Sequence, residues 1–323
     1  MTQRDLMELF SVSQATVSMA LKNNPRISLK LRQEIQKAAR EMGYCPNPAG
    51  QLLRKGKSNL IGVILPSLYY SFYAEFLEEL HNYIQNCGYV LLMKNCDTRE
   101  GFAAAMQSMK HFNVSGIMAV SALDWIKTLL DKSIPTVLLL GHDFTPDPQF
   151  RLSQVYPDMY QSGYDLADHL LKQGRKHPAF LGKIDNAELR FRGFDARIKK
   201  SGIAETPFIH CAKGTTLDGY NLIRSLLEQF PETDAVAVHN DNMAVGALRW
   251  LWEQRIDVPG RIAVTGFDNI REDAFTTPAL TSIGPDCRKF AKTAFDELRK
   301  MISDPTHQSK IKIHCKLTVR ESA

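Results

Sequence analysis

The sequence lacks the features that define several large classes of protein. It has no run of about 18 apolar residues, and it does not begin with a basic segment followed by an apolar one, so we expect neither a membrane span nor a secretory signal. The six cysteines are scattered, without a Cys-x-x-Cys pair or histidines at zinc-finger spacing. We therefore expect a cytoplasmic protein whose cysteines are reduced core residues.

Motifs for enzymatic chemistry are missing too. The sequence has no glycine-rich dinucleotide motif, no phosphate-binding P-loop and no nucleophile elbow. His239, Asn240 and Asp241 could be drawn with Asp268 as a metal or acid–base cluster. However, adjacent residues at a strand end point to different sides, and no spaced histidines support a zinc site. We therefore expect no catalytic activity, no metal and no cofactor.

Positive charge is concentrated at the start of the chain. Residues 1–57 contain ten Lys and Arg against four Asp and Glu, whereas residues 58–323 contain 30 against 31. A small basic head on a nearly neutral body indicates a polyanionic partner, and nucleic acid fits better than a membrane surface.

Residues 1–44 carry three short helical patterns, over about 3–10, 14–21 and 29–42. Ser13 and Ser28 stand where N-caps of the second and third helices are expected, and Gly43 ends the third. Two short helices joined by a tight turn are the elements of a helix-turn-helix, whose second helix presents its N-terminal residues to base edges. This geometry directs five side chains towards DNA: Ser13, Gln14, Ala15, Thr16 and Ser18. A three-helix bundle with a merely solvated polar face is the alternative.

Residues 45–57 read as a linker, because they contain two prolines, two glycines, three cations and no acid. They also contain a helix-compatible run from Ala49 to Arg54 with a Leu52–Leu53 pair. A helix shorter than about 12 residues is marginal in water. We therefore predict a conditional helix that forms only when a partner receives it.

From residue 60 onward, short apolar runs alternate with amphipathic helices, which is typical of parallel α/β sheets. The first set of strands is expected at 60–65, 90–93, 116–120 and 136–140. The second set is expected at 178–181, 208–211, 235–238 and 262–265. Helices are expected between them, for example at 72–87, 158–173, 216–229 and 242–254, and a late helix (288–302) and strand (311–319) follow. Two sets of similar size predict two doubly wound subdomains.

Ligands of open α/β sheets bind beyond the carboxyl ends of the strands. The residues at these ends are rich in carboxylates and amides, with one Arg and several aromatics, which suits a small polar ligand bearing hydroxyls. They are residues 67–72, 95–97, 121, 141–143, 185–190, 240–241 and 267–269. Asp241 also fits as the cap of a helix starting at Asn242.

The head and hinge resemble those of the lac repressor (LacI-type) family. The matching residues run without a gap in spacing: Thr2, Asp5, Leu6, Val12, Ser13, Thr16, Val17, Ser18, Leu21, Ile27, Ser28, Gly43, Tyr44, Pro46, Asn47 and Leu53. Met7, Phe10 and Ser11 depart from the small residues common around the family's turn. Met19 stands where several members have a base-reading Arg, so an apolar contact with a thymine methyl would replace a guanine contact.

This resemblance extends the expected DNA contacts beyond the second helix. Leu53 stands where family members insert a leucine as a wedge between base pairs, and such wedges kink the duplex. Arg54, Lys55 and Lys57 would hold phosphates. The further expected contacts are Met19, Lys22, Arg26, Ser28, Tyr44, Asn47, Gly50 and Leu53.

The body resembles the family's ligand-binding core, which is itself similar to periplasmic sugar-binding proteins. The matching segments include Arg190-x-x-Gly193-Phe194, Asn240-Asp241-x-Met243-Ala244 and Gly266-Phe267-Asp268. The resemblance implies effector contacts from Arg190, Asn240 and Asp268, with Phe72 as a stacking face. It also implies crossovers near 155 and 285.

The domain organisation follows. A helix-turn-helix head (1–44) and a hinge (45–57) precede a body (58–323) that binds the effector and dimerises. The N-subdomain comprises about 58–155 plus 286–316, and the C-subdomain about 156–285 plus the C-terminus. We predict an all-α head on an α/β body of periplasmic-binding-protein type.

The predicted function is sequence-specific regulation of transcription, by repression, as a homodimer on a palindromic double-stranded DNA operator. A small polar effector in the cleft, a sugar or sugar derivative, would control affinity. A purine- or nucleoside-responsive corepressor-type regulator is the alternative. A solute-binding protein without DNA function would share the body, but it would not carry a basic helix-turn-helix head.

Overall fold

The computed structural model describes residues 3–44, 58–120, 126–139, 149–183 and 189–323. The chain divides into two compact units, residues 1–58 and 59–323. The predicted hinge (45–57) lies outside the described residues. No helix in the described ranges is long and apolar enough to cross a membrane.

Three helices form the first unit: α1 (Gln3–Phe10), α2 (Gln14–Leu21) and α3 (Leu29–Glu41). Their small core contains Leu6, Val17 and Ile35, each fully buried. Between α1 and α2, Ser11 adopts φ +48°, a left-handed conformation that costs a residue with a side chain roughly 1–2 kcal/mol. The chain therefore makes the tight turn of a helix-turn-helix without the glycine that would relieve this strain.

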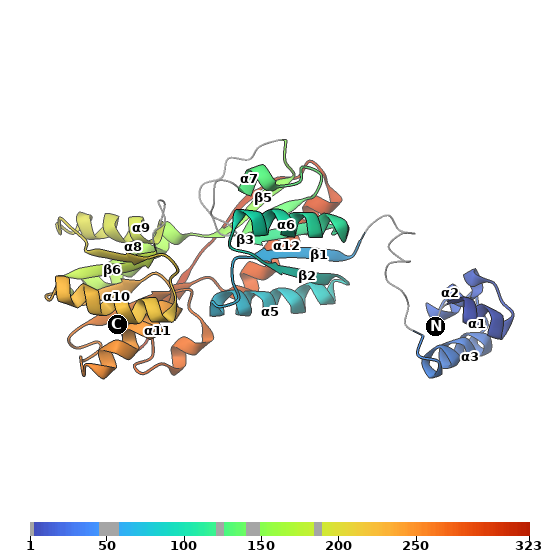
Figure 1. Cartoon of the computed structure of the whole chain (residues 1–323), viewed down its shortest axis with the longest axis horizontal. Coiled ribbons are helices and arrows are strands. Elements are labelled where there is room, and N and C mark those ends of the chain that lie inside the picture. The colour runs from blue at the N-terminus through green and yellow to red at the C-terminus, as the bar shows by residue number, and fades with distance from the viewer. Residues whose placement is uncertain (1–2, 45–57, 121–125, 140–148, 184–188) are drawn as a thin grey trace. The chain divides into compact units, whose positions relative to one another are not determined.

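The second unit contains two six-stranded sheets, and Figure 1 shows each between layers of helices. The N-subdomain is built on the order β11-β5-β4-β3-β1-β2, with all five neighbouring pairs parallel. Its strands are β1 (Leu60–Leu65), β2 (Val90–Asn95), β3 (Gly116–Val120), β4 (Thr136–Leu139), β5 (Leu152–Pro157) and β11 (Lys310–Ile313). Its helices are α5 (Ser71–Asn86), α6 (Arg99–His111), α7 (Ile126–Leu129) and α12 (Cys287–Ser303).

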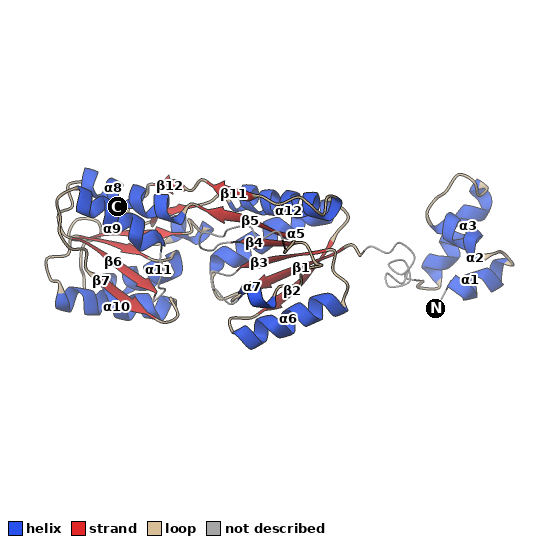
Figure 2. Cartoon of the chain, turned by 90° about the horizontal axis from the view of Figure 1, so that it is seen from above, coloured by secondary structure: helices blue, strands red, loops and turns tan. Residues whose placement is uncertain are grey.

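Side-chain alternation along β1 explains why helices cover both faces of this sheet. Ile61 and Val63 belong to the core beneath α5 and α12, whereas Ile64 belongs to the core beneath α6. Figure 2 shows α6 on one side of the sheet and α12 on the other. The N-subdomain is thus doubly wound.

The C-subdomain repeats this plan in the order β12-β10-β9-β8-β6-β7. Only the edge strand β12 runs antiparallel to its neighbour. Its strands are β6 (Pro178–Lys183), β7 (Phe208–Cys211), β8 (Ala235–Val238), β9 (Ala263–Phe267), β10 (Thr281–Gly284) and β12 (Lys316–Thr318). Its helices are α8 (Met159–Lys172), α9 (Leu189–Lys200), α10 (Thr216–Gln229), α11 (Asp241–Glu253) and the 3-10 helix η1 (Arg271–Phe275).

Three crossovers join the subdomains. They lead from β5 to α8, from β10 to α12 and from β11 to β12. In both sheet orders these strands occupy the same end, so the chain crosses at one edge of the body. The single strand expected at 311–319 is wrong, because β11 ends at Ile313 and β12 begins at Lys316 in the other sheet.

Strands β5 and β10 were not among the strands expected from the sequence, since both carry buried polar side chains where apolar ones are typical. Ser153 of β5 donates to Glu297 Oε1 of α12 at 2.9 Å. Ser282 of β10 donates to Asp241 Oδ1 at 2.7 Å. Both polar residues are buried in pairs whose members lie far apart in the sequence, so no local apolar run marks either strand.

Candidate functional site

The N-terminus of α2 presents short polar side chains to solvent. Ser13 caps the helix, with its Oγ accepting from the Thr16 backbone N–H at 3.2 Å and lying 3.0 Å from Thr16 Oγ1. Gln14 and Ala15 are exposed. Gln14 is therefore the one long polar side chain on the first turn of this helix, whose eight residues include no charged one.

The other predicted DNA contacts of the described head surround α2. Met19 and Tyr44 are half-buried against the head core. Lys22 and Arg26 are exposed, and Ser28 caps α3. Ser18 is half-buried on α2. Asn47, Gly50 and Leu53 lie outside the described residues.

A second cluster lies at the carboxyl ends of β8 and β9 in the C-subdomain. Arg190, in the first turn of α9, donates from Nη2 to Asp268 Oδ1 at 3.5 Å. Its Nη1 is 3.3 Å from His239 Nε2, and its guanidinium lies 5.5 Å from the centre of the Phe267 ring. The Arg190 and Asp268 side chains are only 14% and 11% exposed. The structure thus brings together Arg190 and Asp268, two of the predicted effector contacts.

Asp268 is held in an uncommon backbone conformation, with φ +105°. Gly284 of β10 permits this, since a Cβ there would lie 2.1 Å from the Asp268 carbonyl oxygen. Strained residues of this kind concentrate at functional sites. The position of Asp268 therefore depends on β10 as well as on β9.

Phe72, predicted as a stacking face, is 4% exposed and stacks on Phe290 with ring centroids 6.4 Å apart. The adjacent Tyr73 is the aromatic residue whose pKa depends on the charges of Asp268 and Arg190. Burial raises the pKa of Tyr73, the Asp268 carboxylate raises it further, and the Arg190 guanidinium opposes them. Sequence reasoning missed Tyr73, and its place next to Phe72 was the only signal.

The residue that caps α11 is Asn240 and not Asp241. We predicted that Asp241 caps a helix starting at Asn242. Instead Asn240 is the N-cap, accepting from the Met243 backbone N–H at 2.8 Å and donating to the Gly214 carbonyl at 3.1 Å. Asp241 is fully buried inside the helix, where the Ile270 N–H and the Ser282 hydroxyl donate to its carboxyl group.

Asp241 also interacts with a second buried carboxyl group, that of Asp273 in η1. Burial and the neighbouring Asp273 raise the pKa of Asp241 well above its usual range. Burial raises the pKa of Asp273 to about 7, although Asp241 and Arg320 counteract the rise. Two carboxyl groups in contact cannot both ionise cheaply, so the pair holds a proton at neutral pH.

This pair predicts that stability declines as pH rises. The folded chain keeps a proton that the unfolded chain releases near pH 4, so stability is fully present below that pH and is lost as pH rises through about 7. Asp241→Asn should flatten the decline, because an amide does not titrate and places no charge against Asp273. Thermal unfolding from pH 4.5 to 8 measures this, with Asp165→Asn on α8 as the control. An unchanged slope in Asp241→Asn would rule the pair out as its source.

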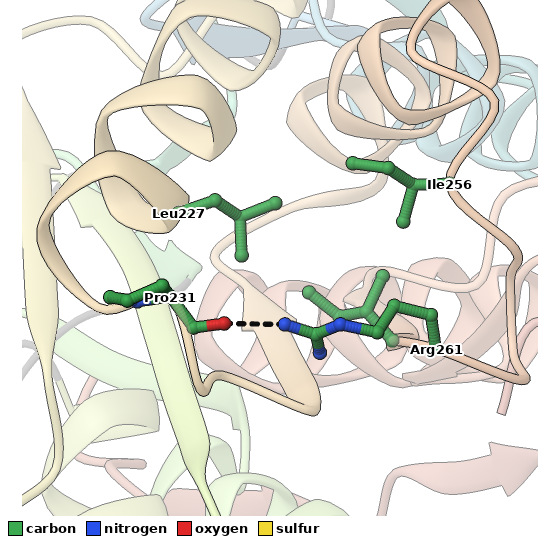
Figure 3. Close-up of a pocket in the computed structure, with 5 residues that line it drawn as sticks. Leu227, Pro231, Ile256 and Arg261 are labelled. Atoms are coloured by element: carbon green, nitrogen blue, oxygen red, sulfur yellow. Dashed lines mark hydrogen bonds between the residues drawn. The ribbon is translucent and has the colours of Figure 1, made fainter.

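Several residues predicted at strand ends lie outside the described ranges, namely 121, 141–143 and 185–188. Among the residues that are described, no group of three or more His, Cys, Asp and Glu side chains could hold a metal ion. A hollow of about 180 Å³ lies elsewhere in the C-subdomain (Figure 3), lined by Leu227, Pro231, Ile256, Arg261 and Ile262. Arg261 uses its guanidinium to bind the carbonyls of Thr233 and Pro231, so this hollow is mainly apolar.

Comparison with known families and proteins assigns both units. Residues 4–47 match the family model of bacterial regulatory proteins of the lacI family, and residues 167–323 match that of the periplasmic binding protein-like domain. Among curated relatives, the HTH-type transcriptional repressor CytR of Escherichia coli (strain K12) is 29% identical over 87% of this chain and 84% of its own length. The repressor PurR of Aliivibrio fischeri (strain MJ11) is 27% identical over 96% and 94%.

The fold has close counterparts among solved structures. The lac repressor dimer bound to operator and the anti-inducer ONPF superposes with a TM-score of 0.88, at 24% identity, covering 100% of this chain and 98% of that one. The helix-turn-helix head and the two mainly parallel sheets are therefore the architecture of that repressor.

Proposed function

The chain belongs to the lacI family of bacterial regulatory proteins, and we propose that this DNA-binding regulator represses transcription as a homodimer. Two heads would occupy the halves of a palindromic operator, since the two-fold symmetry of a dimer is mirrored in its site. The proposal rests on α2 of the basic first unit, because its N-terminus exposes Gln14 and Ala15 beside the Ser13 cap.

Contacts with the DNA divide into three kinds. Ser13, Gln14, Ala15, Thr16, Ser18 and Met19 would face base edges, and Lys22, Arg26, Ser28 and Tyr44 would fix the head on the backbone. Asn47, Gly50 and Leu53 would act in the minor groove, with Leu53 as the wedge. Phosphate contacts make such binding strongly dependent on salt.

The composition of α2 predicts which bases are read. Glutamine pairs with adenine in the major groove, and apolar groups contact the thymine methyl, whereas guanine is read best by Arg or Lys. With Gln14 and Ala15 exposed, Met19 half-buried and no cation on the helix, α2 should prefer A·T pairs.

Two substitutions test that preference. Met19→Arg should create a guanine preference of about 1–3 kcal/mol at one base pair, and Gln14→Ala should relax an adenine preference by a similar amount. Binding titrations against operators changed one base pair at a time measure both. Lys22→Ala is the contrasting variant, because loss of a phosphate contact weakens all sequences alike. A uniform loss in Gln14→Ala would contradict base reading.

The cleft of the body would bind the effector. We propose that Arg190, Asp268 and Asn240 contact it, with Tyr73, supported by Phe72, as the aromatic face. The Arg190–Asp268 pair offers both charge signs and two hydrogen-bonding edges within one buried site, which suits a hydroxyl-bearing sugar or sugar derivative. A purine or nucleoside stacked on Tyr73 is the second candidate.

Control of DNA binding would follow from the geometry of the cleft. An effector shifts a conformational equilibrium only through its differential affinity for the two states. One state would keep the two hinges of the dimer close enough to fold on DNA, and the other would separate them. Because each ordered hinge residue costs about 1–2 kcal/mol of backbone entropy, a small change in spacing would tip operator affinity.

A thermal-shift screen of the full chain against sugars, sugar phosphates and purines tests the effector proposal. A ligand at 100 times its dissociation constant stabilises its target by about 2.7 kcal/mol. We expect a sugar or sugar derivative to raise the melting temperature of the wild type. A response to purines alone would favour the second candidate, and no response to any class would contradict the effector site.

A further inference from the structure

Three consecutive residues after β1 reach from the N-subdomain to the C-subdomain. The Tyr69 hydroxyl lies 3.2 Å from both the Thr216 Oγ1 and the Thr216 backbone nitrogen. The Tyr70 hydroxyl donates to the Lys213 carbonyl at 2.5 Å. The Ser71 N–H donates to Asn242 Oδ1 at 3.3 Å, and the Asn242 amide lies 3.4 Å from Ser71 Oγ.

These contacts gather at the N-termini of two helices. Thr216 begins α10 and Asn242 lies in the first turn of α11. The N–H groups of a helix's first turn have no partner within the helix. The Tyr69 hydroxyl therefore accepts from the Thr216 N–H, which would otherwise bond to water. Tyr69, Tyr70 and Tyr73 also stack edge to face in sequence, which holds the two hydroxyl groups in place.

The contacts of Tyr69 and Tyr70 lie far from the crossovers in the strand order of both sheets. The three crossovers leave the end of each sheet formed by β11 and β5, or by β12 and β10. Tyr69–Ser71 follow β1, next to the opposite edge of the first sheet, and Lys213–Thr216 follow β7, the opposite edge of the second. The subdomains are therefore joined by the chain at one side and by side chains at the other.

A second noncovalent connection lies nearer the crossovers. Ile270, which follows β9, packs into the core of the N-subdomain. Arg271 bonds through its backbone N–H to Glu75 at 2.7 Å and pairs with Glu78 at 2.7 Å, both on α5. Glu75 lies one helical turn from Ser71 on α5, so this connection adjoins the Ser71–Asn242 contact, and the tyrosine contacts lie furthest from the crossovers in the strand order.

From this geometry we propose that Tyr69, Tyr70 and Ser71 form a latch that holds the two subdomains together across the cleft. The three residues act as one unit, because swinging the subdomains apart breaks every contact together. Tyr70 keeps its donor proton, since burial and the Asp218 carboxylate raise its pKa. The latch sets how often the two subdomains swing apart, and it goes beyond the proposed function because all of its contacts are made within the chain.

Hydrogen–deuterium exchange of the full chain, resolved to single amides, tests the latch. The reporters are the N–H groups of Thr216 and Ser71, one on each side of the cleft. Tyr70→Phe removes a hydroxyl that touches neither reporter, and loss of a typical hydrogen bond should speed exchange at both about 5-fold. Tyr69→Phe combined with Tyr70→Phe should speed exchange of the Ser71 N–H about 30-fold.

Tyr220→Phe is the matched control, because the Tyr220 hydroxyl also lies on α10 but bonds to Glu253 within the C-subdomain. It should leave both reporters unchanged. If Tyr70→Phe changes neither reporter, or if the double variant accelerates Thr216 alone, the contacts are independent and there is no latch. No DNA and no effector enters the experiment, so its result is separate from that of the effector screen.

Discussion

Gly246→Ala should destabilise the body by about 3 kcal/mol or more, the upper range for adding a methyl group to a tightly packed site. A Cβ at Gly246 in α11 would lie 1.8 Å from the Thr216 carbonyl oxygen of α10, and one at Gly219 in α10 would lie 1.9 Å from the Met243 carbonyl oxygen. Both obstacles are backbone atoms, which cannot rotate away. The two helices must move apart, and Thr216 and Asn242, which the latch residues contact, would move with them.

The melting temperature measures this effect, and a loss of about 6 °C or more is expected for a unit of this size. Gly101→Ala in α6 is the control. Its Cβ would lie 3.0 Å from two side-chain atoms, Cys96 Cβ and Thr98 Oγ1, with the nearest backbone atom at 3.9 Å. Alanine otherwise favours a helix by about 1 kcal/mol over glycine. Equal stability of the two variants would mean that the close approach of α10 and α11 does not exist in solution.

Arg190→Ala should abolish the response to effector while operator binding is retained. The change removes both the guanidinium that faces Asp268 and the partner of His239 Nε2. Truncating one member of a buried charge pair costs about 3–5 kcal/mol, because the remaining charge is left uncompensated. An effector hydrogen-bonded to both groups would therefore lose its site rather than a single contact.

The measurement is the thermal shift caused by the ligand found in the screen, together with operator affinity. Arg190→Lys separates charge from geometry, since lysine keeps the charge but lacks the planar fork of donors. Arg192→Ala is the matched control, because Arg192 is exposed on the same helix. A normal ligand response in Arg190→Ala would remove Arg190 from the site, and the unfolding curve of each variant separates lost binding from lost folding.

The helices of the head and most strands of the body followed from the sequence because their signals are local. Caps at Ser13 and Ser28 mark where α2 and α3 begin. Continuous apolar runs mark buried parallel strands such as β1. Strands β5 and β10 were not predicted because their buried polar side chains need partners on other elements, which no short window of sequence contains.

The candidate site was predicted in outline and not in detail. The strand-end rule placed Arg190 and Asp268 in one region, and the structure brings them into contact. The burial of Asp241 depends on Ser282 and Ile270, which lie about 30 to 40 residues further along the chain. Gly193, in a segment that matches the family, has a packing role that the sequence alone did not reveal. Gly193 lets α9 approach the Tyr160 carbonyl of α8, and this approach positions Arg190.

Selection of binding sites from random double-stranded DNA by the full chain tests the central claim most directly. We predict enrichment of a palindromic site with A·T pairs where α2 enters the major groove, and a shift to guanine at one position of each half-site with Met19→Arg. Failure to enrich any sequence, at a salt concentration where unspecific binding is suppressed, would contradict the assignment of this chain as a sequence-specific DNA-binding regulator.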